Sequence, residues 1–318
     1  MLLAAKIQLD NAISRIFRLE IHTPALGAAR SILALSLFLT LLFNDPEHQF
    51  SSGLNMVIDN HLDTMGSINY FDLLKDHIFF AKWSACIFLL VVISGYLPQV
   101  TCFLQWYISY SYLNAGLDVE GGDQVISNIS LLLIPICLID KRINHWQKSL
   151  AFVYSSSIDQ CRKIIAYFWF LLIKIQIAVI YFHAATGKFA SPEWINGTAI
   201  YYWVHHPVFG MQTWLHPILD PLLLNKYAVF YITWGVVFME LALFISFFLN
   251  PKYFKKFFIL GVGFHFAIVL LHGLFSFFIS MTGALVLFYL VDYYNWRQER
   301  ATTTIDNTIY RPEYALQT

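Results

Sequence analysis

The sequence contains few charged residues: Asp, Glu, Lys and Arg make up 13% of its 318 residues, against about 25% in an average soluble protein. Basic and acidic residues are equal in number, 20 of each, so no net charge favours nucleic acid or an acidic partner. Hydrophobic residues make up 58% of the chain and aromatic residues 18%, as in proteins that cross a membrane several times. The composition therefore excludes an ordinary soluble domain and predicts a membrane protein.

Cysteine is scarce as well, and the four cysteines form no CxxC motif: Cys86, Cys102, Cys137 and Cys161. All lie in apolar runs or beside basic segments that are predicted to face the cytoplasm. This distribution argues against a structural disulfide and against dithiol exchange. The chain also lacks the serine hydrolase, HExxH, Walker and dinucleotide motifs in a matching context.

Long apolar runs are what the chain has in abundance. A helix needs roughly 17–25 apolar residues to cross about 30 Å of hydrocarbon. About eight runs approach this length, and the third and fourth are the shortest or most polar: 25–43, 78–97, 99–114, 125–139, 164–183, 227–248, 256–272 and 274–291. We therefore predict an all-α fold, a polytopic transmembrane helical bundle that forms a single domain over residues 1–318.

Three segments are predicted to lie outside these spans. Residues 1–24 carry charges at helical spacing and predict an amphipathic helix on the membrane surface. The bundle itself covers 25–296, and 297–318 form a polar cytoplasmic tail. Segment 203–224 contains three prolines and a glycine, so we expect a re-entrant or interfacial segment there rather than a spanning helix.

Basic residues predict the orientation. They gather before the first span, between the fourth and fifth, between the sixth and seventh, and after the eighth: near 6–30, 141–163, 252–256 and 297–311. With eight spans, all four groups lie on one side, which the positive-inside rule identifies as the cytoplasm. The alternate loops are acidic, near 45–76 and 118–123. Both termini are therefore expected in the cytoplasm.

Several ionisable residues lie inside the apolar runs, where each costs several kcal/mol, with estimates from about 2.5. They are predicted to form a buried polar cluster: Lys174, Glu240, His265 and His272. In this cluster we expect Lys174 and Glu240 to form an ion pair with His265 beside it. The alternatives are a structural pair that holds helices together and a proton relay in a transporter, although the chain shows no inverted repeat.

Lys188 lies where the fifth span gives way to a turn marked by glycine and tryptophan. Lys174, Tyr181 and Lys188 are seven residues apart and share one stripe of a helix, on which Ala178 and Ala185 leave room for a close neighbour. Burial disfavours the charged form of a lysine, and a general base needs that property. The alternative is a lysine that extends to the interface and marks the end of the span.

Segment 203–224 also contains three histidines, which are candidate metal ligands. His205 and His206 are adjacent and precede a proline, and His216 follows further on. Adjacent histidines point in divergent directions, so we predict no metal site.

Longer stretches carry a resemblance to a known family. "IQIAVIYFHAATGKFASPEWINGTAIYYW" resembles the signature of the HTTM-domain family, the multi-span bacterial relatives of the vitamin K-dependent gamma-carboxylase. "GGDQVISNISLLLIPICLID", "VVFMELALFISFFLNPKYFKKF" and "FHFAIVLLHGLFSFFISM" are similar to further parts of that family. The length and the missing carboxylase C-terminal domain are most similar to the SdpB-type subgroup, which helps to mature a secreted sporulation-delaying, or cannibalism, toxin. The resemblance thus describes 1–318 as one HTTM-like domain.

The resemblance also implies roles for individual residues. Lys188 stands at the position of the carboxylase's catalytic base, with Tyr181 as a positioning hydroxyl and Asp123 as a charge partner of the lysine. Asp123 stands near a catalytic histidine of the carboxylase, and a carboxylate cannot stabilise an anion as an imidazole donor can. A reduced quinone of the vitamin K or menaquinone type is the implied cofactor, and its binding residues are Trp194, His183 and His265.

As a function, the resemblance implies maturation of an exported peptide toxin in the bacterial cytoplasmic membrane. The implied partners are the toxin precursor, a second maturation subunit of the SdpA type and membrane lipids, with no nucleic acid. Three alternatives remain open at this point: a non-enzymatic export or immunity scaffold, a quinone-dependent carboxylase-like enzyme and a proton-coupled transporter.

Overall fold

The structure is a computed structural model that describes residues 19–50, 68–147, 156–207 and 209–309. Within these ranges the regular elements are helices, and no β-strand occurs. The first half of the chain contains α2 (Pro24–Phe43), α3 (Pro46–Phe50), α5 (Tyr70–Leu73), α6 (Ile78–Ser94), α7 (Pro98–Ala115), α8 (Gly121–Leu138) and α9 (Ser157–Gly187). The second half contains α10 (Pro192–Ile195), α11 (Ala199–Val204), α12 (His216–Leu223), α13 (Lys226–Ile245), α14 (Phe254–His272), α15 (Phe275–Leu285) and α16 (Val291–Ile309). The predicted all-α polytopic bundle is confirmed.

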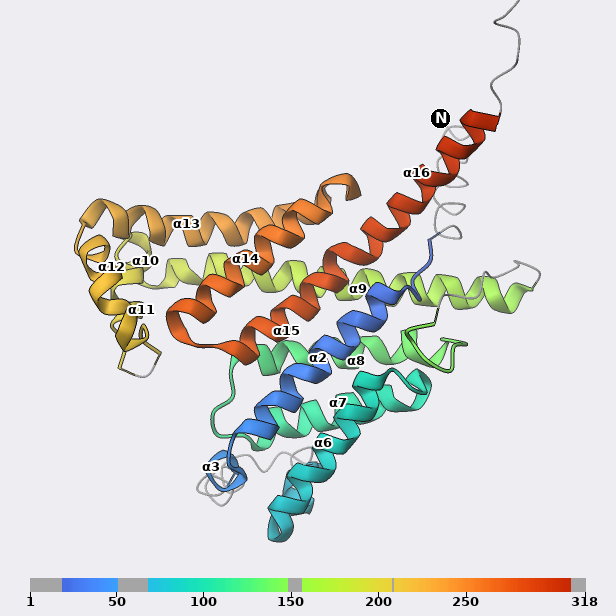
Figure 1. Ribbon diagram of the computed structural model, residues 1–318, viewed down its shortest axis with the longest axis horizontal. Coiled ribbons are helices and arrows are strands. Elements are labelled where there is room, and N and C mark those ends of the chain that lie inside the picture. The colour runs from blue at the N-terminus through green and yellow to red at the C-terminus, as the bar shows by residue number, and fades with distance from the viewer. Residues whose placement is uncertain (1–18, 51–67, 148–155, 208, 310–318) are drawn as a thin grey trace, which may run out of the picture.

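The long helix α9 connects two groups of helices (Figure 1). On one side it packs against α8, which continues into a group with α7, α6, α2 and α15. On the other it packs against α13, and α14 packs against α15. The short helices α10, α11 and α12 gather where α9 ends and α13 begins, at the left in Figure 1. We call this the α10–α12 end of the bundle.

Seven helical segments among the described residues are long and apolar enough to cross a membrane: Pro24–Phe43, Lys75–Ser94, Gly121–Leu138, Ser157–Ala190, Lys226–Phe248, Pro251–His272 and Phe275–Ala301. They correspond to seven of the predicted spans, so the protein is a multi-pass membrane protein. The third predicted span, 99–114, is the helix α7, which is too polar to meet the same criterion.

The polar residues of α7 face other helices. Gln105 and Thr101 are buried, and both bind the guanidinium of Arg30 on α2, over 3.1 and 2.7 Å. Helix α7 has 18 residues, as does α8, and lies beside it. Its first turn is held to the segment after α8 by a hydrogen bond from Leu97 N to Ile143 O, 2.8 Å long. The two helices therefore run antiparallel over the same length.

The predicted flanking segments have different outcomes. Most of the predicted surface helix, 1–18, lies outside the described residues. The predicted tail 297–318 continues the helix α16 as far as Ile309, and its last residues lie outside the described ranges. The described residues of segment 203–224 contain the end of α11, a short 3-10 turn and α12, and none of these helices is long enough to span, as expected from the prolines.

Candidate functional site

The predicted stripe of α9 faces the interior of the bundle. Lys174, Ala178, Tyr181 and Ala185 are all buried, with at most 8% of each residue exposed. Since α9 has 31 residues, it is about 46 Å long, and the stripe extends along its second half to Lys188. A chain of small and polar side chains therefore points at the neighbouring helices.

Lys188 ends this stripe in a partly buried ion pair with Glu240 of α13. Its ammonium nitrogen lies 2.7 Å from each carboxylate oxygen of Glu240 and donates a third hydrogen bond to the carbonyl of Ala184, 3.0 Å away. The ring of Trp194 lies 4.9 Å from the same nitrogen. The side chains of Lys188 and Glu240 are 17% and 9% exposed. Because Ala184 lies one turn back along α9, the charge is held inside the bundle and not at its rim.

The turn after Lys188 is fixed against α13 by a glycine. Gly197 has a φ of 73°, and a Cβ there would lie 2.3 Å from the ring of Phe230. The next helix is tied down as well, since the backbone nitrogen of Ile200 donates to Thr233 Oγ1 over 3.2 Å. These contacts place Trp194, on α10, beside the Lys188 ammonium.

The predicted pair of Lys174 with Glu240 is wrong. Lys174 forms its ion pair with Asp292, at the start of α16, and lies 5.0 to 6.0 Å from three aromatic rings, those of Phe247, Phe254 and Phe288. The physical reason is distance. Lys174 and Lys188 are 14 residues apart, or about 21 Å along the helix, so one carboxylate cannot reach both. Asp292 was missed because it follows the last predicted span directly.

Between the two ion pairs, Tyr181 binds His265 of α14. The phenol oxygen lies 3.0 Å from His265 Nε2, and both residues are buried, with 2% and 3% exposed. His265 Nδ1 is also buried and has no hydrogen-bond partner among the described residues. A buried ring nitrogen without a partner is uncommon, because buried polar atoms are normally satisfied. His265 therefore retains an unused donor or acceptor inside the bundle.

Asp123 lies elsewhere, at the start of α8. Its carboxylate accepts a hydrogen bond from the backbone nitrogen of Glu120 over 3.0 Å and completes a capping box with that residue. Burial raises the pKa of Glu120, although a hydrogen bond from Ser276 acts in the opposite direction. The carboxylate paired with Lys188 is thus that of Glu240, and the catalytic role of Asp123 stays a prediction.

The other predicted site residues are Trp194, His183 and His272, and only the first of them lies at the Lys188–Glu240 pair. Trp194 joins Lys188, as described above. His183 is exposed and lies off the buried stripe of α9. His272 ends α14 and lies 2.6 Å, through Nδ1, from the carbonyl of Phe209, so it does not belong to the buried cluster. The predicted single cluster is in fact two ion pairs with Tyr181 and His265 between them.

Fold and site together define a class: a multi-pass helical membrane protein with a buried Lys–Glu pair beneath a tryptophan at one end of the bundle. An ammonium 2.7 Å from a carboxylate can pass its proton to it directly, and the resulting neutral amine is a base.

The comparisons with known proteins add a family. The chain is 31% identical to the sporulation-delaying protein SdpB of Bacillus subtilis (strain 168) over 259 residues, which cover 81% of this chain and 79% of that protein. It is 32% identical to the uncharacterized protein YitO of the same organism over 275 residues, covering 84% and 85%. The chain therefore belongs to the SdpB family. No family model and no solved structure matches, so the wider HTTM and carboxylase resemblance stays a prediction.

Proposed function

We propose that this protein takes part in the maturation of an exported peptide toxin and that the Lys188–Glu240 pair is its working site. The family supports the first half of the proposal, since SdpB is by name a sporulation-delaying protein. The partly buried ion pair supports the second half, because a structural anchor at the end of a span would extend its ammonium into water. The proposed partners are the peptide precursor, a second maturation subunit of the SdpA type and the surrounding lipids.

The proposed location is the bacterial cytoplasmic membrane, with the site towards its outer face. Helix α9 begins at Ser157, inside the basic stretch 141–163, which the positive-inside rule assigns to the cytoplasm. Its other end, with Lys188, then lies near the outer side, where an exported peptide arrives.

The proposed chemistry is proton abstraction by Lys188. Glu240 takes a proton from the ammonium, and the neutral amine then takes a proton from the substrate, which is left as an anion. Tyr181 and His265 lie two turns further into the bundle and position the reacting group through the phenol and the ring nitrogen.

A reduced quinone is the cofactor implied by the carboxylase resemblance, and the residues present fit its chemistry. The indole face of Trp194 suits a planar apolar ring, and the unpartnered His265 Nδ1 suits a hydroxyl or carbonyl group. When bound, a reduced quinone would supply an acidic hydroxyl group for Lys188 to deprotonate.

The two ion pairs also bear on the transporter and scaffold functions. A transporter hypothesis rested on one cluster of Lys174, Glu240 and His265, which the two separate ion pairs do not support. A non-enzymatic scaffold remains the competing account, and in it the Lys188–Glu240 pair only joins α9 to α13.

Mass spectrometry of the secreted peptide tests the proposal. A candidate toxin precursor is co-expressed with the wild-type protein or with Lys188→Ala or Lys188→Arg, and membrane levels of each variant are measured in parallel. We expect the mature peptide to be lost with both variants when the samples are compared at matched membrane levels. Unchanged peptide would overturn the proposal in favour of the scaffold.

A further inference from the structure

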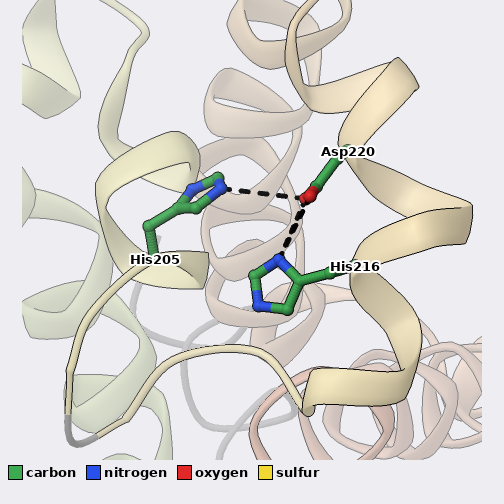
Figure 2. Close-up of side chains that lie close together, drawn as sticks. All are labelled: His205, His216 and Asp220. Atoms are coloured by element: carbon green, nitrogen blue, oxygen red, sulfur yellow. Dashed lines mark hydrogen bonds and ion pairs between the residues drawn. The ribbon is translucent and has the colours of Figure 1, made fainter.

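Three side chains with metal-binding atoms converge at the α10–α12 end of the bundle (Figure 2). His205 follows α11, His216 begins α12, and Asp220 lies one turn further along α12. Asp220 Oδ1 lies 3.1 Å from His216 Nδ1 and 3.7 Å from His205 Nε2. The three ligand atoms all lie within 4.8 Å of one another. Ligand atoms around a tetrahedral Zn²⁺ are roughly 3.3 Å apart, for bonds of about 2.0–2.1 Å, so small side-chain rotations suffice for a common centre.

The hydrogen bond on the far side of His205 orients the ring so that Nε2 faces that centre. His205 Nδ1 lies 2.7 Å from the carbonyl of Tyr201, which can only accept, so Nδ1 carries a proton. In the neutral imidazole, Nε2 then has a lone pair, and this lone pair faces the oxygen of Asp220. Two acceptors aimed at each other repel unless a proton or a metal ion lies between them. A second nitrogen that donates to a backbone carbonyl is also the usual arrangement of a metal-binding histidine.

We propose that His205, His216 and Asp220 bind a Zn²⁺ ion. Two imidazoles and one carboxylate favour zinc over Mg²⁺ or Ca²⁺, which prefer oxygen ligands. The side chains are 34%, 33% and 39% exposed, so an ion can enter from solvent and keep a fourth position for water. A bound ion would connect the end of α11 to the start of α12, beside the apolar cluster that contains Val204, Met211 and Leu215.

Neighbouring histidines were expected to diverge and so to form no metal site, and His205 and His206 do diverge. His206 stacks on Trp203 and Phe209 instead. The third ligand is Asp220. It lies one helical turn after His216, so the two side chains share a face only because α12 is a helix. The proposal is independent of the proposed function, because its test reads metal binding and not the peptide.

The test is Zn²⁺ binding to the purified full-length protein, without a polyhistidine tag, by competition with a chromogenic chelator. His205→Gln, His216→Gln and Asp220→Asn are compared with His206→Gln, the matched control from the adjacent position. We expect one Zn²⁺ per chain for wild type and control, and affinity at least about tenfold weaker for the other three. No stoichiometric binding by wild type, or an equal loss in His206→Gln, would overturn the site.

If the variants fail to fold, X-ray absorption of the zinc-loaded wild type decides the question without them. The proposed site predicts imidazole ligands at about 2.0–2.1 Å. A thiolate sulfur at about 2.3 Å, or a shell without imidazole, would overturn the proposal.

Discussion

At the scale of single residues, the Lys188 ammonium has three protons to donate and three acceptors in place: both oxygens of Glu240 and the carbonyl of Ala184. The pair is partly shielded from water by Trp194. In such surroundings the loss of one partner leaves a buried charge uncompensated, whereas the loss of both does not. This asymmetry gives a test of the pair that does not depend on activity.

We expect Glu240→Gln to destabilise the detergent-solubilised protein by about 3–5 kcal/mol, as a broken buried ion pair does. Lys188→Gln should cost a similar amount, and the double variant should be clearly more stable than the sum of the two single losses predicts. Thermal unfolding of the four proteins measures this coupling. Additive losses would mean that the two charges act independently.

At the scale of helices, close approaches at glycines hold the elements in place. Gly95 ends α6 with a φ of 84°, and a Cβ there would lie 2.6 Å from the ring of His145. Burial and the nearby charges of Arg30 and Arg142 lower the pKa of His145 to about 3, so the ring is neutral and can lie among arginines. The segment after α8 is thereby fixed against α6 and α2.

Gly95→Ala should therefore destabilise the protein by about 1–3 kcal/mol, through both the left-handed backbone and the overlap with His145. Gly263→Ala in α14 is the matched control, because nothing lies within 4 Å of the position of its Cβ, and a helical glycine gains from alanine. Denaturation in mild detergent compares the two variants. Equal stability would show that His145 moves aside freely.

At the scale of the whole molecule, the parity of the spans decides where the termini lie. Seven segments qualify as spans by composition, and α7 is not among them. It nevertheless runs antiparallel to the qualifying helix α8, and each of the two helices has 18 residues. Its length is about 27 Å, and its buried polar residues Thr101 and Gln105 bind Arg30 of α2 and do not face lipid. This arrangement favours eight crossings.

With eight crossings, fluorescent-protein fusions at the N-terminus and at the C-terminus should both fluoresce in bacterial cells, as expected for the cytoplasm. A fusion in the loop between α7 and α8 should stay dark and serves as the control. One fluorescent and one dark terminus would mean that α7 does not cross.

Much of this architecture follows from the sequence, because apolar run length and helical periodicity are local properties. They predicted the bundle, the buried stripe of α9 and the position of Lys188. The partners of the charges did not follow, because they depend on how far each helix extends past its neighbours. Asp292, for example, reaches Lys174 after a π-helical stretch, Val286–Leu290, which joins α15 to α16. No periodicity in the sequence marks that shift.

The central claim is that Lys188 acts as a base, and one comparison tests it most directly. Lys188→Arg retains a positive charge for Glu240 but cannot give up its proton at working pH, while Lys174→Arg makes the same change in the other ion pair of α9. Intact-mass spectrometry of the secreted peptide is measured for both at matched membrane levels. The account predicts that mature peptide is lost with Lys188→Arg and retained with Lys174→Arg. Mature peptide in equal amounts from both variants would contradict it.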